Sequence, residues 1–142
     1  MYQKILVTLD TSASDPEILS AVTSLAAMMK SELLLLHVAD GWVARNFNQL
    51  KLAESEEMKA DRAYLNEAAG NLRILGLTVS THLALGDPAT EILKTAVLEQ
   101  CDLIAMTSHG HRFIGDIIYG STINEVRHRT TIPVLLVRAE QK

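Results

Sequence analysis

The order of apolar segments along the chain is the feature that most constrains its fold. Short aliphatic runs alternate with longer segments in which apolar residues recur every three or four positions, as they do on one face of a helix. The runs are Ile5–Leu9, Leu33–Val38, Leu77–Leu83, Leu103–Met106 and Pro133–Val137. Strands that alternate strictly with helices form a parallel sheet, because each right-handed crossover lays its helix on a face of that sheet. The order therefore predicts a doubly wound α/β fold with five parallel strands and helices on both faces.

Two of the intervening segments begin with residues that favour a helix start. Ser14 and Glu17 have the spacing of a capping box, in which two side chains bond backbone amides of the first turn. Asp87 is followed by Pro88, which suits a helix cap and a first helical position. The apolar stripe of the helix after Asp87 includes Val97. We therefore expect helices to begin at both sites and Val97 to be buried.

Composition and charge limit the function classes open to this chain. Its 142 residues suffice for one domain, residues 1–142, and a formal net charge of −4 argues against a general nucleic-acid binder. No apolar run approaches the roughly 18 residues that a membrane-spanning helix needs. The single cysteine, Cys101, excludes an intramolecular disulfide and fits a reducing compartment. We expect a cytoplasmic protein that binds neither nucleic acid nor membrane.

The loops after Leu9, Val38 and Met106 are the places where this fold would bind a ligand. In doubly wound sheets, ligands lie beyond the carboxyl ends of the strands, at the point where the strand order reverses. All three loops follow a buried strand of the predicted sheet. A ligand site is therefore expected where these loops meet.

The third of these loops has the composition of an anion site. Gly110 and Gly120–Thr122 are separated by nine residues, and Thr122 and Glu125 have the spacing of a capping box. Glycines let a backbone approach a ligand closely, and the unpaired amides of a first helical turn attract anions. Histidine and arginine outnumber acids here, beginning at His109. The glycines also fit a plain loop turn and a helix start, so the pattern leaves both interpretations open.

The same loop carries most of a known glycine motif. Universal stress proteins that bind ATP have a glycine, two residues, a glycine, nine residues, and a glycine followed by serine or threonine. Gly110, Gly120 and Ser121 match the second and third glycines and the hydroxyl residue, whereas Thr107 stands at the first glycine. Four further segments match, namely Lys4–Asp10, Leu36–Val38, Gly86–Pro88 and Pro133–Val137. The chain therefore resembles the universal stress protein family over nearly its whole length.

This resemblance implies a fold and a ligand. The fold is adenine nucleotide alpha hydrolase-like, with strand order 3-2-1-4-5, and the ligand is ATP with magnesium on its phosphates. Asp10 matches the acidic residue that meets the ribose or adenine side of the nucleotide, and the backbone of Val38 matches the position that recognises adenine. The triphosphate cradle is matched by Gly110, Gly120, Ser121 and Thr122. The neighbouring residues Thr8, Met106, Thr107 and His109 complete the expected site.

Two departures from the family pattern leave two functions open. Thr107 adds a side chain at the first glycine, and Thr8 stands where some binders carry a proline. The leading hypothesis is a regulatory, ATP-binding stress protein with at most slow hydrolysis, because no carboxylate pair has a recognisable acid/base arrangement. The alternative is a dimeric interaction module that works without nucleotide.

Three further expectations concern a metal, a histidine and an interface. Asp10 and Asp40 are candidates to hold magnesium together with the phosphates, since that ion prefers few carboxylates plus phosphate oxygens. His37, on an apolar strand, is expected to be a satisfied core or subunit-contact histidine. The resemblance implies a homodimer joined through Pro133–Val137, and an apolar edge strand needs such a covering.

Overall fold

The computed structural model describes residues 1–39, 56–108 and 120–139, and strands alternate with helices throughout these ranges. The strands are β1 (Lys4–Thr8), β2 (Glu32–Ala39), β3 (Val79–Leu85), β4 (Leu103–Ser108) and β5 (Val134–Arg138). The helices are α1 (Asp15–Met29), α3 (Glu56–Ile74), α4 (Pro88–Leu98) and α5 (Gly120–Arg129). Every expected strand is present, although β3 begins two residues after Leu77 and β5 one residue after Pro133. The later start of β5 fits the chemistry of Pro133, because proline lacks the backbone N–H that a strand residue donates to the neighbouring strand.

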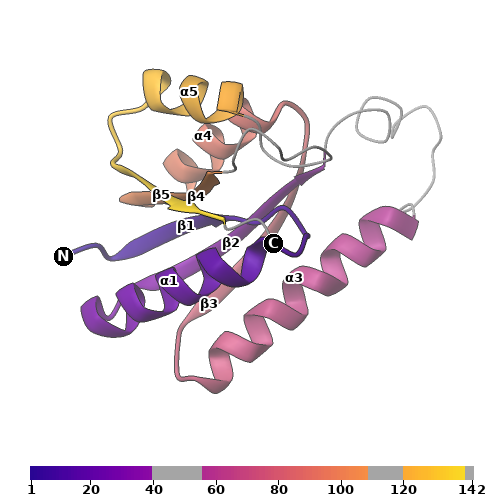
Figure 1. Cartoon of the computed structure of the whole chain (residues 1–142), viewed down its shortest axis with the longest axis vertical. Helices are drawn as coiled ribbons and strands as arrows, with labels where there is room; N and C mark the ends of the chain where they lie inside the picture. Colours follow the sequence, from indigo (N-terminus) through magenta and orange to yellow (C-terminus); the bar gives the residue numbers. More distant parts are fainter. Residues whose placement is uncertain (40–55, 109–119, 140–142) are drawn as a thin grey trace.

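The five strands form one parallel sheet in the order β3-β2-β1-β4-β5, which confirms the predicted fold (Figure 1). From β1 the chain steps outward through β2 to β3, and then returns to the other side of β1 to add β4 and β5. The strand order therefore reverses between β1 and β4. In sheets of this kind, that reversal is where a ligand finds a crevice beyond the strand ends.

Alternate residues of the central strands face two separate cores. Ile5, Val7 and Leu9 pack with buried residues of α1 and α3 on one face of the sheet. Leu6 packs on the other face, in the cluster to which α4 and α5 contribute. Figure 1 shows the same two layers of helices, one on each side of the sheet. Because both faces are covered, β1 is apolar almost throughout, as expected for a strand in a buried parallel sheet.

Two expectations about local structure were wrong. Ser14 makes no side-chain capping bond to the first turn of α1, and its hydroxyl lies 2.8 Å from that of Ser12 instead. Val97 is 69% exposed, because the buried stripe of α4 runs through Ala89, Ile92 and Ala96. Val97 directly follows Ala96 and so lies about 100° further round the helix.

Asp87 confirms its predicted role as the cap of α4. Its carboxylate accepts hydrogen bonds from the amide of Thr90, at 3.0 Å, and from the hydroxyl of Thr90, at 2.8 Å. Pro88 takes the first helical position, as expected. Within the described ranges, no helix is both long and apolar enough to cross a membrane.

Candidate functional site

The carboxyl ends of β1 and β4 bring four of the expected site residues to the point of strand reversal. Thr8 and Asp10 come from the end of β1, and Met106 and Thr107 from the end of β4. The pairing Val7↔Ala105 makes the two strands direct neighbours. All four residues are at most 6% exposed, so the polar ones lie in a setting where unpaired hydrogen-bonding groups are costly. Val38 lies half-buried near the end of β2, the next strand.

The two threonines of this region differ in direction and in bonding. Thr8 follows the alternation of Leu6 toward α4 and α5, and its hydroxyl donates to the carbonyl of Ala105 at 3.4 Å. Thr107 follows the alternation of Ala105 toward α1 and α3. Thr8 therefore has a partner inside the sheet, and the two side chains lie on opposite faces.

The hydroxyl of Thr107 has no hydrogen-bond partner, and it is the one buried side-chain polar atom in the described ranges for which this holds. The residue is 2% exposed, so bulk water does not compensate the missing bond. A buried polar group left unsatisfied costs about 1–3 kcal/mol. Such groups are rare in folded proteins, and they are expected where a ligand or a bound water supplies the partner.

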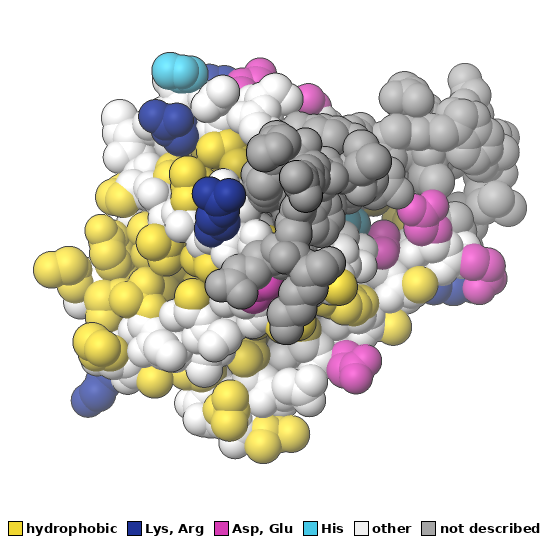
Figure 2. Space-filling model, viewed as in Figure 1, with side chains coloured by type: hydrophobic (Ala, Val, Ile, Leu, Met, Phe, Trp, Pro, Cys, Tyr) yellow, Lys and Arg dark blue, Asp and Glu magenta, His cyan; other side chains and the backbone are white. Residues whose placement is uncertain are grey.

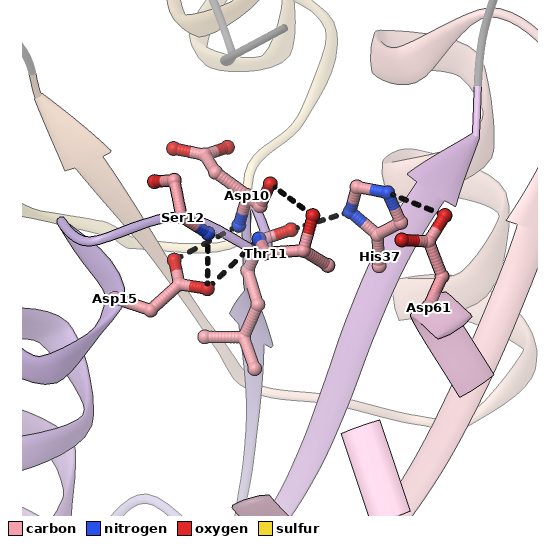
Figure 3. A network of polar contacts seen from close by, with 7 residues as sticks. Asp10, Thr11, Ser12, Asp15, His37 and Asp61 are labelled. Carbon is pink, nitrogen blue, oxygen red and sulfur yellow. Dashed lines mark hydrogen bonds and ion pairs between the residues drawn. The ribbon is translucent and has the colours of Figure 1, made fainter. Parts of the chain in front are cut away.

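Asp15 organises the loop between β1 and α1. Its buried carboxylate accepts hydrogen bonds from the amides of Asp10 at 2.9 Å, Thr11 at 2.8 Å and Ser12 at 3.3 Å (Figure 3). The backbone of Thr11 is in the left-handed region, with φ 58°. The loop amides are therefore satisfied by an internal carboxylate, and the loop holds Asp10 at the strand end.

Sequence reasoning missed this role of Asp15. The capping-box spacing drew attention to Ser14 and Glu17 instead. A signal was available, because aspartate side chains often bond backbone amides in the turns where strands end. The hydroxyl of Tyr64, on α3, donates to Oδ2 of the same carboxylate at 2.7 Å, the oxygen that also accepts from Thr11 and Ser12. Burial, followed by this bond to Asp15, raises the pKa of the Tyr64 phenol well above its ordinary value.

His37 links the ends of β1 and β2 to α3. Its Nδ1 lies 2.7 Å from the carbonyl oxygen of Leu9, and its Nε2 lies 3.5 Å from Oδ2 of Asp61 (Figure 3). Burial raises the pKa of the Asp61 carboxyl, and the nearby imidazole partly offsets that effect. The expectation of a satisfied histidine at this position is confirmed. Its partner on α3 was not identified from the sequence.

Helix α5 begins at Gly120, two residues before the cap expected at Thr122. Ser121 is exposed and Thr122 half-buried, so both lie in the first turn. That turn carries no acidic residue, whereas α1, α3 and α4 each carry at least one in theirs. A β-carbon built on Gly120 would meet no atom within 4 Å. Within the described residues, the first turn of α5 therefore contributes no carboxylate that competes for its amides and hydroxyls.

Part of the expected site lies outside the described residues. His109, Gly110 and Asp40 all fall in the ranges 40–55 and 109–119. Among residues 1–39, 56–108 and 120–139, no three His, Cys, Asp or Glu side chains come together as a metal site. The proposed magnesium pair of Asp10 and Asp40 thus stays a prediction.

Comparison with protein families gives one match over nearly all of the chain. The model of the universal stress protein family matches residues 1–138. The chain belongs to this family. Universal stress protein YxiE of Bacillus subtilis is 30% identical to this universal stress protein, over 97% of the present chain and 100% of its own. Universal stress protein MJ0577 of Methanocaldococcus jannaschii is also 30% identical, over 97% and 96% of the two chains.

Solved structures of universal stress proteins share the fold. The structure of MJ0577 has a TM-score of 0.78 at 31% identity, and the match covers 100% of the present chain and 99% of that one. A universal stress protein in complex with cAMP has a TM-score of 0.75 at 20% identity, covering 98% and 99%. Another, from Archaeoglobus fulgidus in complex with dAMP, has a TM-score of 0.70 at 19% identity, covering 96% and 98%. At these lower identities, the last two structures show the common fold alone.

Proposed function

We propose that this universal stress protein binds ATP at the carboxyl ends of β1, β2 and β4, and that the nucleotide controls its activity as a cytoplasmic regulatory module. The observation that carries the proposal is the buried hydroxyl of Thr107, which lacks a partner at the strand reversal. Adenosine offers several ring nitrogens and ribose oxygens that can accept or donate a bond there. Binding of the nucleotide would thus satisfy a group that the free protein leaves unsatisfied.

Each part of the nucleotide has a proposed partner. The Asp10 carboxylate, at the end of β1, accepts from the ribose hydroxyls, and the backbone of Val38 recognises adenine. The phosphates lie at the start of α5, where backbone amides and the hydroxyls of Ser121 and Thr122 donate. Anions are favoured at the amino end of a helix, and the first turn of α5 has no carboxylate to repel them.

Magnesium enters this account with the nucleotide. Phosphate oxygens are its preferred ligands, and it usually needs only one or two carboxylates from the protein. Hydrolysis in the proposed complex is at most slow, so the role of ATP is regulatory. Support for the adenine class comes from the two relatives of the same fold that were solved with cAMP and with dAMP.

We also propose that the protein is a homodimer joined through β5. This strand is an edge of the sheet in the single chain, and Leu136 on it is 42% exposed. Figure 2 shows hydrophobic side chains gathered around β5, whereas acidic ones gather over α3. Pairing of two β5 strands would cover an apolar edge that otherwise invites aggregation.

A melting experiment with a nucleotide panel tests the proposed ligand class. Ligands that bind only the folded state raise the free energy of unfolding, by about 2.7 kcal/mol at roughly 100 times Kd. Magnesium ATP is expected to raise the melting temperature, with GTP and CTP as matched controls of equal charge. Equal shifts with all three nucleotides would mean non-specific phosphate binding and would remove adenine from the proposal.

The alternative function is a dimeric interaction module that works without nucleotide. It is favoured by the β-carbon of Thr107, which stands where the motif of ATP-binding universal stress proteins has its first glycine. The variant Thr107→Gly separates the two functions. ATP binding by the native protein supports the regulatory module, whereas binding by the glycine variant alone supports the interaction module.

A further inference from the structure

The peptide unit between Leu9 and Asp10 is held from both sides. Its carbonyl lies 2.7 Å from Nδ1 of His37, and its N–H donates to Oδ1 of Asp15 at 2.9 Å (Figure 3). Since both ends are bonded, the unit cannot rotate about its neighbouring torsions without breaking a buried hydrogen bond. The backbone that carries the Asp10 side chain is therefore fixed by two residues from different elements.

Helix α3 supports both of those residues. Asp61 meets Nε2 of His37 at 3.5 Å, and the hydroxyl of Tyr64 donates to Asp15 at 2.7 Å. Asp61 and Tyr64 are three positions apart, so they lie on the same face of α3. That face also carries the buried side chain of Leu65, which anchors the helix against the sheet. One face of α3 thus contacts both residues that bond the end of β1, Asp61 through His37 and Tyr64 through Asp15.

The bond to Leu9 determines how His37 carries its protons. A carbonyl oxygen only accepts, so Nδ1 must hold the hydrogen, and Nε2 is the atom that faces Asp61. When one proton is shared between Nε2 and the carboxyl, the two groups attract. When neither Nε2 nor the carboxyl holds a proton, the lone pair of Nε2 faces the Asp61 carboxylate and the contact becomes repulsive. The attraction between His37 and Asp61 is therefore lost once a rise in pH removes that shared proton.

We propose that Asp61 and Tyr64, acting through His37 and Asp15, form a clamp that positions Asp10 and the adjoining Val38 backbone for the nucleotide, and that its Asp61–His37 arm makes binding pH-dependent. This inference rests on the function proposed above. His37 and Asp61 are positioning residues in it, because they touch the backbone of β1 and each other rather than the nucleotide. Val38 follows His37 directly on β2, so the same contact orients both strand ends.

Charged groups from three parts of the described chain act on the residues of the clamp. Asp15 from α1, Asp10 from the end of β1 and Glu67 from α3 are the carboxylates that contribute to raising the pKa of Tyr64. On β3, the residue in register with His37 is the uncharged Leu83. Among the described residues, His37 lowers the pKa of the Asp61 carboxyl, in the direction opposite to burial.

The test is the pH dependence of magnesium ATP binding, measured by calorimetry from about pH 6 to about pH 8, on the alkaline side of the ordinary Asp61 value of 3.8, because burial raises the pKa of that carboxyl. Excess magnesium keeps the phosphates ionised over this range. The affinity of the native protein for magnesium ATP is expected to fall about three- to tenfold as pH rises over this range, the equivalent of one lost hydrogen bond.

Two variants remove the pH dependence while keeping hydrogen bonds. His37→Asn keeps an N–H for the Leu9 carbonyl but does not titrate, and the amide in Asp61→Asn can both donate to and accept from Nε2 of His37. Both variants are expected to bind with a flat pH profile.

The controls separate positioning from general damage. His37→Ala is expected to bind about three- to tenfold more weakly at every pH, whereas His82→Asn, at an exposed position of β3, should match the native profile. If His37→Ala does not fold, the profiles of the two asparagine variants still decide. A native pH profile in both asparagine variants would overturn the clamp and leave the proposed function intact. No ATP binding by the native protein at any pH would overturn both.

Discussion

Thr107 is the residue at which the two proposed functions diverge. Its hydroxyl is buried without a partner in the described ranges, although Thr8, on the neighbouring strand, bonds a carbonyl. Such a group lowers the stability of the free protein, and a bound ligand or water that bonds it would restore that stability. The same residue carries a β-carbon that the glycine of the family motif lacks.

Replacing Thr107 with valine separates these effects. Valine has nearly the same shape and no hydroxyl, so the free energy of unfolding of the ligand-free protein should rise by about 1 kcal/mol. ATP affinity should fall at the same time, because the nucleotide loses a partner. Denaturant unfolding and calorimetry measure the two quantities, and Thr107→Ser is the matched control that keeps the hydroxyl. A valine variant that is less stable, or that binds ATP as tightly as the native protein, would contradict this assignment.

At the scale of the elements, the start of α4 depends on the charge of its cap residue, Asp87. The two bonds from Thr90, its hydroxyl first and then its amide, hold the pKa of Asp87 below its ordinary value of 3.8. A lowered pKa means that the carboxylate stabilises the fold above that ordinary value, and that the stabilisation is lost as pH falls through the lowered one.

Asp87→Ala is expected to lower the free energy of unfolding by about 1 kcal/mol at neutral pH, since a helix cap is lost. The difference from the native protein should shrink as pH falls below 3.8, which melting curves at several pH values would show. Asp87→Asn retains a cap oxygen without a charge and should lose this pH dependence. A difference that stays constant down to low pH would mean that the carboxylate charge plays no part.

The start of α5 allows a charge test of the phosphate position. Ser121→Asp places a carboxylate in a first turn that has none, which suits the helix dipole and should leave the melting temperature of the free protein unchanged or higher. The same charge should repel phosphates and weaken ATP binding severalfold. Ser121→Asn has the same shape without the charge, and it should bind like the native protein. Equal ATP affinities of the two variants would place the phosphates elsewhere.

The sequence predicted regular elements well and the bonding between them poorly. Apolar runs and turn residues identified β1 and α4, because these features depend on neighbours in the chain. The Asp61–His37 and Tyr64–Asp15 contacts join residues far apart in sequence, and no local pattern indicates them. Val97 was wrongly expected in the core because it is apolar and directly follows the buried stripe of α4. In the structure that stripe ends at Ala96, and Val97 is exposed.

At the scale of the whole molecule, the covered central sheet and its exposed edge have different roles. The ends of β1 and β4 form the proposed ligand site, whereas β5 is free on one side in the single chain. That residues 1–142 form a single domain stays a prediction, as does the cytoplasmic location.

The proposed dimer interface can be tested by a substitution on β5. Light scattering coupled to size exclusion should give the mass of a dimer for the native protein at micromolar concentration. Leu136→Lys places a charge on the apolar edge and should give a monomer. Leu98→Lys, at an exposed leucine of α4, is the control and should remain dimeric. A native monomer, or a dimer that tolerates the Leu136 change, would exclude this interface.

Calorimetric titration of the native protein with magnesium ATP tests the central claim most directly. The account predicts saturable heat with one nucleotide per chain, and a loss of affinity in Asp10→Asn, which keeps the shape of the residue at the end of β1 and removes its charge. The absence of binding heat at millimolar ATP, together with an unchanged melting temperature, would contradict the proposal that this protein binds the nucleotide.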